Sequence, residues 1–398
     1  MRISRDTNRT VYKEFCGGEI EPKVHAEKYF EPDIVKYSVM SIDVLKLKKP
    51  PRKILIIKPS SLGDVVHSLP FLNALRDSFP RAEIHWIIAK GLEGLLEGHP
   101  MINKLWIINK DDWKRVKGAG TTIKELRSLF KSLKAEKYDI VIDLQGLLRS
   151  GILAKATGAP VRIGFKEGRE GSRIFYTHTV KAGKEVHAVD RYLEIAKFLG
   201  CDISDIKFPF PLSFNSPEVI YRLLQTDNPP SPPFDKGGTG GFCEKYAVIV
   251  PGARWETKRW YPERFGELSS MLSLKSLVVG GESDIDIANI VIRNSGGNAI
   301  SAAGKTTLKE LIEIMRNAKF VVTNDSGPMH IAAALNVPVF AIFGPTNPLR
   351  TGPYGKSHVI FRKGLECSPC YKKKCKNIRC MDLISVKEIA DVIRQSGD

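Results

Sequence analysis

Short apolar runs alternate with helix-like segments along this sequence, and this alternation limits the folds open to the chain more than any other feature. Residues 53–58 (KILIIK) are a short apolar run that predicts a buried parallel strand. Further strands are expected at 84–89, 105–108 and 139–143, and helices at 123–133, 147–156 and 188–199. Strands that alternate with helices favour a parallel α/β sheet.

The second half of the chain repeats the pattern. Strands are expected at 246–250, 276–279, 320–323 and 337–343, and helices at 262–272, 285–294, 308–316, 327–335 and 386–395. We therefore predict two doubly wound parallel sheets, each in its own Rossmann-like domain. Ligands of such sheets bind at the carboxyl ends of the strands, and here we also expect binding in a cleft between the halves.

Composition divides the 398 residues into four parts. Residues 1–50 have weak periodicity and are expected to be an irregular, charged lead-in. Residues 51–215 form the predicted N-terminal domain and residues 245–398 the C-terminal domain. The linker at 216–244 contains the insertion NPPSPPFDKGGTGG (228–241), whose proline and glycine content does not suit a packed core.

The formal net charge of +17 is concentrated in three segments. Residues 103–137 hold ten basic and four acidic groups, residues 149–184 eight and two, and residues 356–380 eight and one. Such segments suit phosphates, an anionic membrane surface or nucleic acid, and composition does not choose between them. Because the sequence has no RNP, KH or helix-turn-helix motif, a nucleic-acid-binding protein is the second hypothesis.

The termini and the cysteines predict a cytoplasmic protein. The first residues (MRISRD) lack the apolar core of a signal peptide, and no apolar run approaches the roughly 18 residues of a membrane-spanning helix. Without a signal for export, the seven cysteines are expected to be reduced thiols.

The first chemical motif is KPSSLGDVVHSLP (58–70), where a strand ends and a helix begins. Asp64 is expected at the carboxyl end of the strand, where a carboxylate can face a ligand as a general base. The alternative is that Ser61 or Asp64 only caps the helix.

The second motif is NDSGPMH (324–330), directly after an apolar strand. Asp325 or Ser326 can cap the following helix, and Gly327 lets backbone N–H groups approach a diphosphate at the positive helix end. His330 falls on the first turn of that helix. A structural cap with a packed histidine is the alternative.

The third motif is PGARWETKRWYPE (251–263), which follows another strand. A glycine and small residues at a strand exit, followed by the cations Arg254 and Lys258, are typical of a phosphate-binding loop. The alternative is a loop whose cations face water, which Trp255 and Trp260 make less favourable.

Two weaker candidates lie near these motifs. Glu282 follows Gly280-Gly281 at a strand exit, where it can bind ribose hydroxyls or cap the next helix. Gly304-Lys305-Thr306 is not a Walker motif, because position 299 is Ala299 rather than glycine. We retain Thr306 as a candidate donor-binding residue.

Taken together, these motifs resemble the bacterial ADP-heptose:lipopolysaccharide heptosyltransferases, glycosyltransferase family 9. The resemblance runs from about residue 52 to 398 and rests on KPSSLGDVVHSLP (58–70), DLQGLLRSG (143–151), HAVDRYL (187–193), PGARWETKRWYPERF (251–265) and TNDSGPMHIAAALNVPVFAIFGPTNP (323–348). GD-x-x-x-S/T-L-P combined with D-S/T-G-x-x-H is specific for that family. The chain departs from it at Arg254, where related members often have a small hydroxyl residue.

The resemblance implies a GT-B fold, with the acceptor bound by the N-terminal half and the nucleotide sugar by the C-terminal half. Asp64 matches the family's catalytic base, and Lys258 its lysine on the donor diphosphate. Asp325, Ser326, Gly327 and His330 match the donor-binding motif, and Arg254, Glu282 and Thr306 complete the predicted donor site. The acceptor site is expected to include Ser61, Gly63, Arg149, Arg169 and Arg173, although each arginine alone also suits a solvated surface.

The implied reaction inverts the configuration of heptose as it passes from ADP-heptose to the inner core of lipopolysaccharide. Because Lys258 and the helix end at Ser326–Gly327 can stabilise the leaving diphosphate, no cofactor is expected to be obligatory, and Mg²⁺ would at most stimulate. In this family the acceptor is Kdo for transferase I and heptose for transferase II or a later enzyme. DLQGLLRSG and HAVDRYL resemble transferase I and so favour Kdo, whereas the cysteine tail resembles transferase II and favours heptose. We expect a cytoplasmic enzyme held peripherally on the inner face of the inner membrane by its basic segments.

Other hypotheses remain open on the sequence. The donor could be another nucleotide sugar, or the chain could be a membrane scaffold without activity. Four cysteines near the C-terminus, Cys367, Cys370, Cys375 and Cys380, could hold Zn²⁺ or an iron–sulfur cluster. Their spacing lacks paired CxxC motifs, so we predict no metal.

Overall fold

The computed structural model describes residues 13–15, 20–22, 49–109, 119–211, 218–224 and 245–397. The chain divides into two compact units. One comprises Glu27–Leu212 and is called the six-stranded unit, and the other comprises Met1–Ala26 with Ser213–Asp398 and is called the eight-stranded unit.

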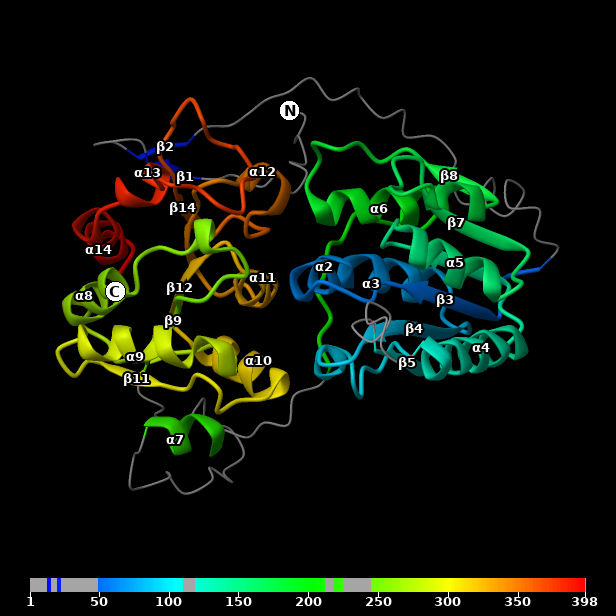
Figure 1. Cartoon of the computed structure of the whole chain (residues 1–398), viewed down its shortest axis with the longest axis horizontal. Coiled ribbons are helices and arrows are strands. Elements are labelled where there is room, and N and C mark those ends of the chain that lie inside the picture. The colour runs from blue at the N-terminus through cyan, green and yellow to red at the C-terminus, as the bar shows by residue number, and fades with distance from the viewer. Residues whose placement is uncertain are drawn as a thin grey trace, which may run out of the picture. The chain divides into compact units, whose positions relative to one another are not determined.

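The six-stranded unit contains one fully parallel sheet (Figure 1). Its strand order is β5 (Lys104–Ile108), β4 (Glu83–Ala89), β3 (Lys53–Ile57), β6 (Ile140–Asp143), β7 (Val161–Phe165) and β8 (His178–Val180). The apolar run in β3 is buried from Ile54 to Ile57, as a central parallel strand requires.

Helices of the six-stranded unit pack in two groups, and right-handed crossovers put these groups on opposite faces of the sheet. One group is α2 (Leu62–His67), α3 (Leu69–Ser78) and α6 (Ala188–Phe198); the other is α4 (Ala119–Ala135) and α5 (Leu148–Ala156). The short helix η3 (Ser172–Phe175) packs on α5.

The eight-stranded unit repeats this architecture and adds two strands. The order is β11 (Ala299–Ser301), β10 (Ser276–Val278), β9 (Ala247–Val250), β12 (Phe320–Asn324), β13 (Val339–Ile342), β14 (His358–Phe361), β1 (Lys13–Phe15) and β2 (Ile20–Pro22). All neighbours are parallel except β1 and β2.

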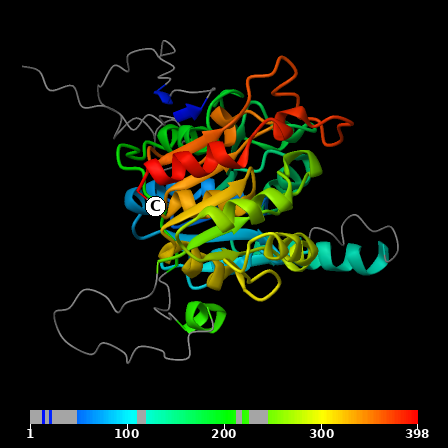
Figure 2. The same cartoon turned by 90° about the vertical axis from the view of Figure 1, so that its left-hand side faces the viewer.

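Helices again form two groups in the eight-stranded unit. α8 (Pro262–Met271) packs against α9 (Ile285–Arg293) and α14 (Val386–Gln395), and α10 (Leu308–Asn317) packs against α11 (Gly327–Ala334). Figure 2 views the chain from the side on which α14 lies. The shorter helices are α7 (Glu218–Leu224), α12 (Pro348–Thr351) and α13 (Arg379–Asp382). Buried side chains such as Trp260 and Phe265 fill the core beneath α8.

The prediction of an α/β fold with two doubly wound parallel sheets is confirmed. The expected strands and helices are present within a few residues, but β7, β8, β11 and β14 were not predicted. These strands are only three to five residues long and contain polar residues, so their apolar signal is weak.

The prediction that residues 1–50 are irregular is wrong for six of them. Lys13–Phe15 and Ile20–Pro22 form β1 and β2, and β1 extends the sheet of the eight-stranded unit by pairing with β14. Most of the other lead-in residues, the insertion at 228–241 and part of the basic segment at 103–137 lie outside the described residues.

Strand order reverses once in each sheet, and this reversal positions the candidate sites. In the six-stranded sheet β3 lies between β4 and β6, and in the other sheet β9 lies between β10 and β12. The connections from such central strands diverge to opposite faces, which leaves a crevice for ligands beyond the carboxyl ends. The three motifs follow β3, β9 and β12.

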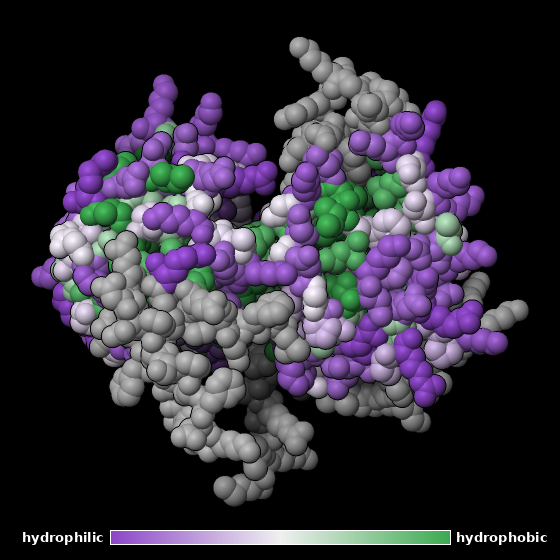
Figure 3. All heavy atoms as spheres, turned by 90° about the horizontal axis from the view of Figure 1, so that it is seen from below, coloured by the Kyte–Doolittle hydropathy of each residue, from purple (hydrophilic) through white to green (hydrophobic). Residues whose placement is uncertain are grey.

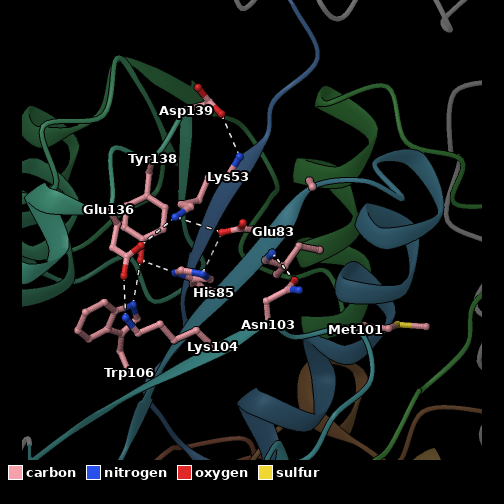
Figure 4. A network of polar contacts seen from close by, with 12 residues as sticks. Lys53, Glu83, His85, Met101, Asn103, Lys104, Trp106, Glu136, Tyr138 and Asp139 are labelled. Atoms are coloured by element: carbon pink, nitrogen blue, oxygen red, sulfur yellow. Dashed lines mark hydrogen bonds and ion pairs between the residues drawn. The ribbon is translucent and has the colours of Figure 1, made fainter.

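A polar network lies at the opposite, amino edge of the six-stranded sheet (Figure 4). The Lys53 ammonium is 3.1 Å from a Glu83 carboxylate oxygen and 2.9 Å from one of Glu136, and Lys104 contacts the second Glu136 oxygen at 2.6 Å. Trp106 donates a hydrogen bond to the Tyr138 hydroxyl, 2.9 Å away. These contacts join β3, β4, β5 and the end of α4.

No helix within the described ranges combines the length and the apolar character needed to cross a membrane. On the face shown in Figure 3, hydrophilic side chains predominate in both units, and smaller hydrophobic patches lie among these side chains.

Candidate functional site

Each unit carries a cluster of charged side chains at the carboxyl edge of its sheet. The first follows β3 and β6 in the six-stranded unit. The second follows β9, β12 and β13 in the eight-stranded unit.

Asp64 stands in the first turn of α2, immediately beyond β3. Its Oδ2 accepts hydrogen bonds from the Ser61 backbone N–H (3.0 Å) and from the Ser61 hydroxyl (2.7 Å). Its side chain is nevertheless 39% exposed. Asp64 therefore caps α2, as the alternative expected, but its carboxylate also remains accessible to a ligand, so capping does not exclude its predicted role as a base.

Two buried groups approach the other oxygen of Asp64. The Lys58 ammonium is 3.9 Å from Oδ1, and the Tyr192 hydroxyl donates to Oδ1 at 3.3 Å. Lys58 also lies 5.1 Å from the centre of the Tyr192 ring. Burial lowers the pKa of Lys58, and the nearby carboxylates of Asp64 and Asp143 oppose that shift.

Asp143, the last residue of β6, completes this buried cluster. Its carboxylate accepts hydrogen bonds from the Tyr176 hydroxyl (2.6 Å) and from the backbone N–H groups of Gln145 (2.8 Å) and Gly146 (3.0 Å). Burial raises the pKa of Asp143, and these hydrogen bonds act against that rise. The turn leading to α5 is thereby held beside β3.

Arg149, Arg169 and Arg173, the predicted acceptor arginines, are all exposed. Arg149 is on α5 and Arg173 on η3, which packs on that helix, while the Arg169 N–H donates to the Gly146 carbonyl at 2.8 Å. Ser61 is exposed and Gly63 is buried in α2.

The second cluster centres on an ion pair between Lys258 and Asp325. The Lys258 ammonium is 2.6 Å from Oδ2 of Asp325, whose side chain is 5% exposed. The Thr346 hydroxyl, from the loop after β13, donates to the same oxygen at 2.6 Å. Lys258 also lies 4.8 Å from the centre of the Trp255 ring. Three loops that follow three neighbouring strands therefore meet at one carboxylate.

Asn324, the last residue of β12, ties the loop after β9 into place. Its side-chain amide donates to the Pro251 carbonyl at 2.7 Å and accepts from the Trp260 N–H at 3.0 Å. Pro251 and Trp260 flank the segment that contains Lys258. The two hydrogen bonds therefore attach both ends of this loop to β12, the strand that precedes Asp325.

Backbone N–H groups at the start of α11 lie beside this ion pair in sequence and in space. Ser326 precedes the helix with an extended backbone, and its hydroxyl is 3.1 Å from that of Thr323. Gly327 is the first helical residue, and the predicted histidine, His330, is buried in the same helix. The helix end supplies a partial positive charge that suits a phosphate.

The Asp284 side chain, beyond the end of β10, lies close to the backbone of Gly252 and Gly280. A Cβ added at Gly252 would lie 2.7 Å from an oxygen of Asp284, and one added at Gly280 would lie 2.7 Å from the Asp284 Cβ. Asp284 also accepts a hydrogen bond from the Gly281 N–H at 3.0 Å. The capping carboxylate after β10 is therefore Asp284, and the predicted Glu282 is exposed beside it.

The remaining donor candidates lie near this edge without a contact that defines their role. Arg254 is exposed in the loop after β9, and Thr306 is partly buried in the loop after β11. Their proposed roles remain predictions.

Sequence reasoning missed Tyr192, Asp143, Asn324, Asp284 and Thr346. All but Asp284 lie within quoted motifs, and for Asp143 and Asn324 the position at a strand end was an available signal. Tyr192 is 128 residues from Asp64, and no local pattern could have paired them.

The four cysteines near the C-terminus lie in a region that the structure describes fully. Cys367 and Cys375 are exposed, and Cys370 and Cys380 are partly buried. Among the described residues, no group of three or more His, Cys, Asp or Glu side chains is arranged to hold a metal ion.

A family model described as "Glycosyltransferase family 9 (heptosyltransferase)" matches residues 126–380. Lipopolysaccharide heptosyltransferase 1 of Pseudomonas aeruginosa is 28% identical over 330 residues, which cover 81% of this chain and 87% of that protein. The protein of the same name from Escherichia coli K12 is 27% identical, with 78% of this chain and 93% of that protein covered.

Solved structures show the same fold. A family 9 glycosyltransferase from Veillonella parvula superposes with a TM-score of 0.70 at 26% identity, covering 86% of this chain and 96% of that one. The Escherichia coli heptosyltransferase WaaC with ADP gives a TM-score of 0.68 at 23% identity, covering 87% and 100%. The predicted GT-B fold is thereby confirmed.

Proposed function

Because the chain belongs to glycosyltransferase family 9, the heptosyltransferase family, we propose that it transfers heptose from ADP-heptose to the inner core of lipopolysaccharide with inversion of configuration. Relatives named lipopolysaccharide heptosyltransferase support the transferred sugar and the class of acceptor, and the solved heptosyltransferase with ADP supports the nucleotide of the donor.

The observation that carries this proposal is the Lys258–Asp325 pair beside the start of α11, beyond β9 and β12. This is the position at which doubly wound sheets bind the phosphates of nucleotides. A lysine, a hydroxyl from Thr346 and free N–H groups at a helix end converge there. We assign the donor diphosphate to this site, with Ser326, Gly327 and His330 as further contacts.

The leaving group determines what this site must do in the reaction. As the bond between the anomeric carbon and the diphosphate oxygen breaks, the electron pair remains on ADP and negative charge grows there. Lys258 and the N–H groups at Ser326–Gly327 are positioned to stabilise that charge. On this account no metal is obligatory, and added Mg²⁺ would only stimulate.

Asp64 supplies the base in the proposed mechanism. Its exposed carboxylate would take the proton from an acceptor hydroxyl, whose oxygen forms a bond to the anomeric carbon on the side opposite ADP. The Ser61 hydrogen bonds and the Tyr192 hydroxyl would fix the orientation of the carboxylate. The buried ammonium of Lys58 places a positive charge beside it.

We propose that the exposed face of α5 and η3 meets the lipid acceptor and the anionic inner-membrane surface. Arg149 and Arg173 suit phosphates, as does Arg169. Beside them, Ile174 is 78% exposed, which suits insertion among lipid headgroups. The lipid acceptor explains the basic segments, so nucleic acid is not proposed as a partner.

Kdo is the proposed acceptor sugar, and heptose is the alternative. The motifs DLQGLLRSG and HAVDRYL support Kdo, as do the relatives named heptosyltransferase 1. The cysteine tail, together with a relative named heptosyltransferase 2, supports the alternative.

The purified full-length chain tests the proposal directly. ADP release would be measured with ADP-heptose and two acceptors, Kdo-lipid A and its heptosylated product, with UDP- and GDP-sugars as donor controls. We expect release of ADP with Kdo-lipid A, and release about 1,000-fold slower with the Asp64→Asn variant. Activity only with the heptosylated acceptor would reassign the acceptor, and no transfer from any nucleotide sugar would refute the proposal.

A further inference from the structure

A basic segment at residues 366–378, between β14 and α13, packs directly against the candidate donor site. The Thr257 hydroxyl, next to Lys258, donates to the Lys372 carbonyl at 2.7 Å. The backbone N–H groups of Cys370 and Tyr371 donate to the Pro345 carbonyl at 3.0 and 2.8 Å. The segment is therefore fastened to the loop that carries Lys258 and to the loop that carries Thr346.

Trp255 brings a second lysine to the same place. The Lys258 ammonium lies 4.8 Å from the centre of its ring, and the Lys373 ammonium lies 5.5 Å from it. An indole ring attracts a cation electrostatically. Two lysines from segments far apart in the sequence therefore share one aromatic ring at the edge of the donor site.

These two lysines differ in how their charge is balanced. Lys258 is paired at 2.6 Å with the buried carboxylate of Asp325, so the pair has no net charge. Lys373 is exposed, and within the described ranges no carboxylate forms an ion pair with it. A diphosphate brings at least two negative charges, so it requires positive charge beyond the Lys258–Asp325 pair.

We propose that Lys373 binds the diphosphate of the donor as a second lysine beside Lys258. This inference rests on the proposed function, in that the ligand of the site carries a diphosphate. Trp255 holds both ammonium groups at the loop after β9, and Lys373 contributes a positive charge that no carboxylate of the described residues balances. The cysteine-rich segment is thus part of the donor site.

Calorimetric titration of the full-length chain with ADP and with adenosine tests this role. Lys373→Met removes the charge and keeps an aliphatic side chain against Trp255. Lys374→Met, on the adjacent exposed lysine, is the matched control with the same loss of charge. We expect Lys373→Met to weaken ADP binding about fivefold, to leave adenosine binding unchanged and to reduce the salt dependence of ADP binding. Lys373→Arg should retain ADP affinity within about twofold.

The outcomes separate this inference from the proposed function. Equal ADP affinities for Lys373→Met and Lys374→Met would overturn the role of Lys373, as would an equal loss of adenosine binding. A wild type that binds neither ADP, UDP nor GDP would refute both proposals. A wild type that binds ADP through Lys373 but transfers no heptose would refute only the proposed function.

Discussion

Lys53 begins strand β3 and Lys58 directly follows its last residue, so the two lysines lie at opposite edges of the sheet, where their surroundings differ sharply. Lys53, at the amino edge, contacts the carboxylates of Glu83 and Glu136, and these hydrogen-bonded ion pairs raise its pKa. Lys58, at the carboxyl edge, is 3% exposed, and burial lowers its pKa. The carboxylate of Asp64 is 3.9 Å from it.

The charges at the amino edge are paired with one another and stabilise the sheet, whereas the Asp64 carboxylate at the carboxyl edge remains available to a ligand. At the amino edge, close ion pairs connect three strands, and Glu136 bonds to two lysines at once. At the carboxyl edge, Asp64 keeps 39% of its side chain exposed, while Lys58 and Tyr192 beside it are buried. Neutralising a charge should therefore change stability at the first edge and catalysis at the second.

The largest effect is expected from Asp64→Asn. The amide keeps the size of the side chain and one oxygen for Ser61, but it cannot accept the proton of the acceptor. We expect kcat to fall about 1,000-fold with little change in melting temperature. Steady-state kinetics and thermal unfolding of the same preparation provide the check. A variant that keeps more than about a tenth of wild-type kcat would show that Asp64 is not the base.

Lys258→Met should have the next largest effect, because it removes a cation from the leaving group and leaves the buried Asp325 unpaired. We expect kcat/KM to fall about 100-fold and the melting temperature to drop. The double variant Lys258→Met/Asp325→Asn should recover much of the stability without activity, because no buried charge is then left unpaired. Recovery of activity in the double variant would contradict the role of Lys258.

Glu136→Gln should lower stability and leave kcat unchanged. Hydrogen bonds from Lys104 and Lys53 hold the pKa of Glu136 at about 2, below its usual value of 4.5. A depressed pKa in the folded state stabilises the fold above pH 4.5, and this contribution disappears as the pH falls toward 2. We expect a loss of roughly 1–2 kcal/mol at pH 7.

Denaturant unfolding of wild type and Glu136→Gln between pH 7 and pH 2 would measure this contribution. The difference between the two proteins should shrink steadily below pH 4.5. A difference that does not vary with pH would exclude the ion pairs as its source.

Tyr192→Phe should have the smallest effect and would test whether the buried groups orient Asp64. The hydroxyl donates to Asp64 Oδ1 over 3.3 Å, a long hydrogen bond. We expect kcat to fall about threefold. The ring remains to pack against Lys58, and KM for the donor should not change because the proposed donor site lies in the eight-stranded unit. An unchanged kcat would leave Ser61 as the group that orients the base.

Much of the fold could be predicted from the sequence, because buried parallel strands need continuous apolar runs such as KILII. Short strands such as β11 (AIS) carry too little apolar signal to be found in this way. Strands β1 and β2 are equally short, and the pairing of β1 with β14 joins segments at opposite ends of the chain, which no local pattern can predict.

The candidate site divides along similar lines. Asp64, Lys258 and Asp325 follow predicted strands. Their location at the carboxyl ends of these strands could therefore be inferred from the sequence alone. Tyr192, Thr346 and Lys373 could not be assigned, because each reaches the site from a distant segment.

By itself, the sequence determined the two sheets and the strand ends that carry a carboxylate or a lysine, because hydrophobic periodicity and helix capping are properties of neighbouring residues. Only the tertiary structure decided which charges are balanced. Lys53, Lys58, Lys258 and Lys373 are the same residue type, and the partner and burial of each depend on which distant segment packs against it.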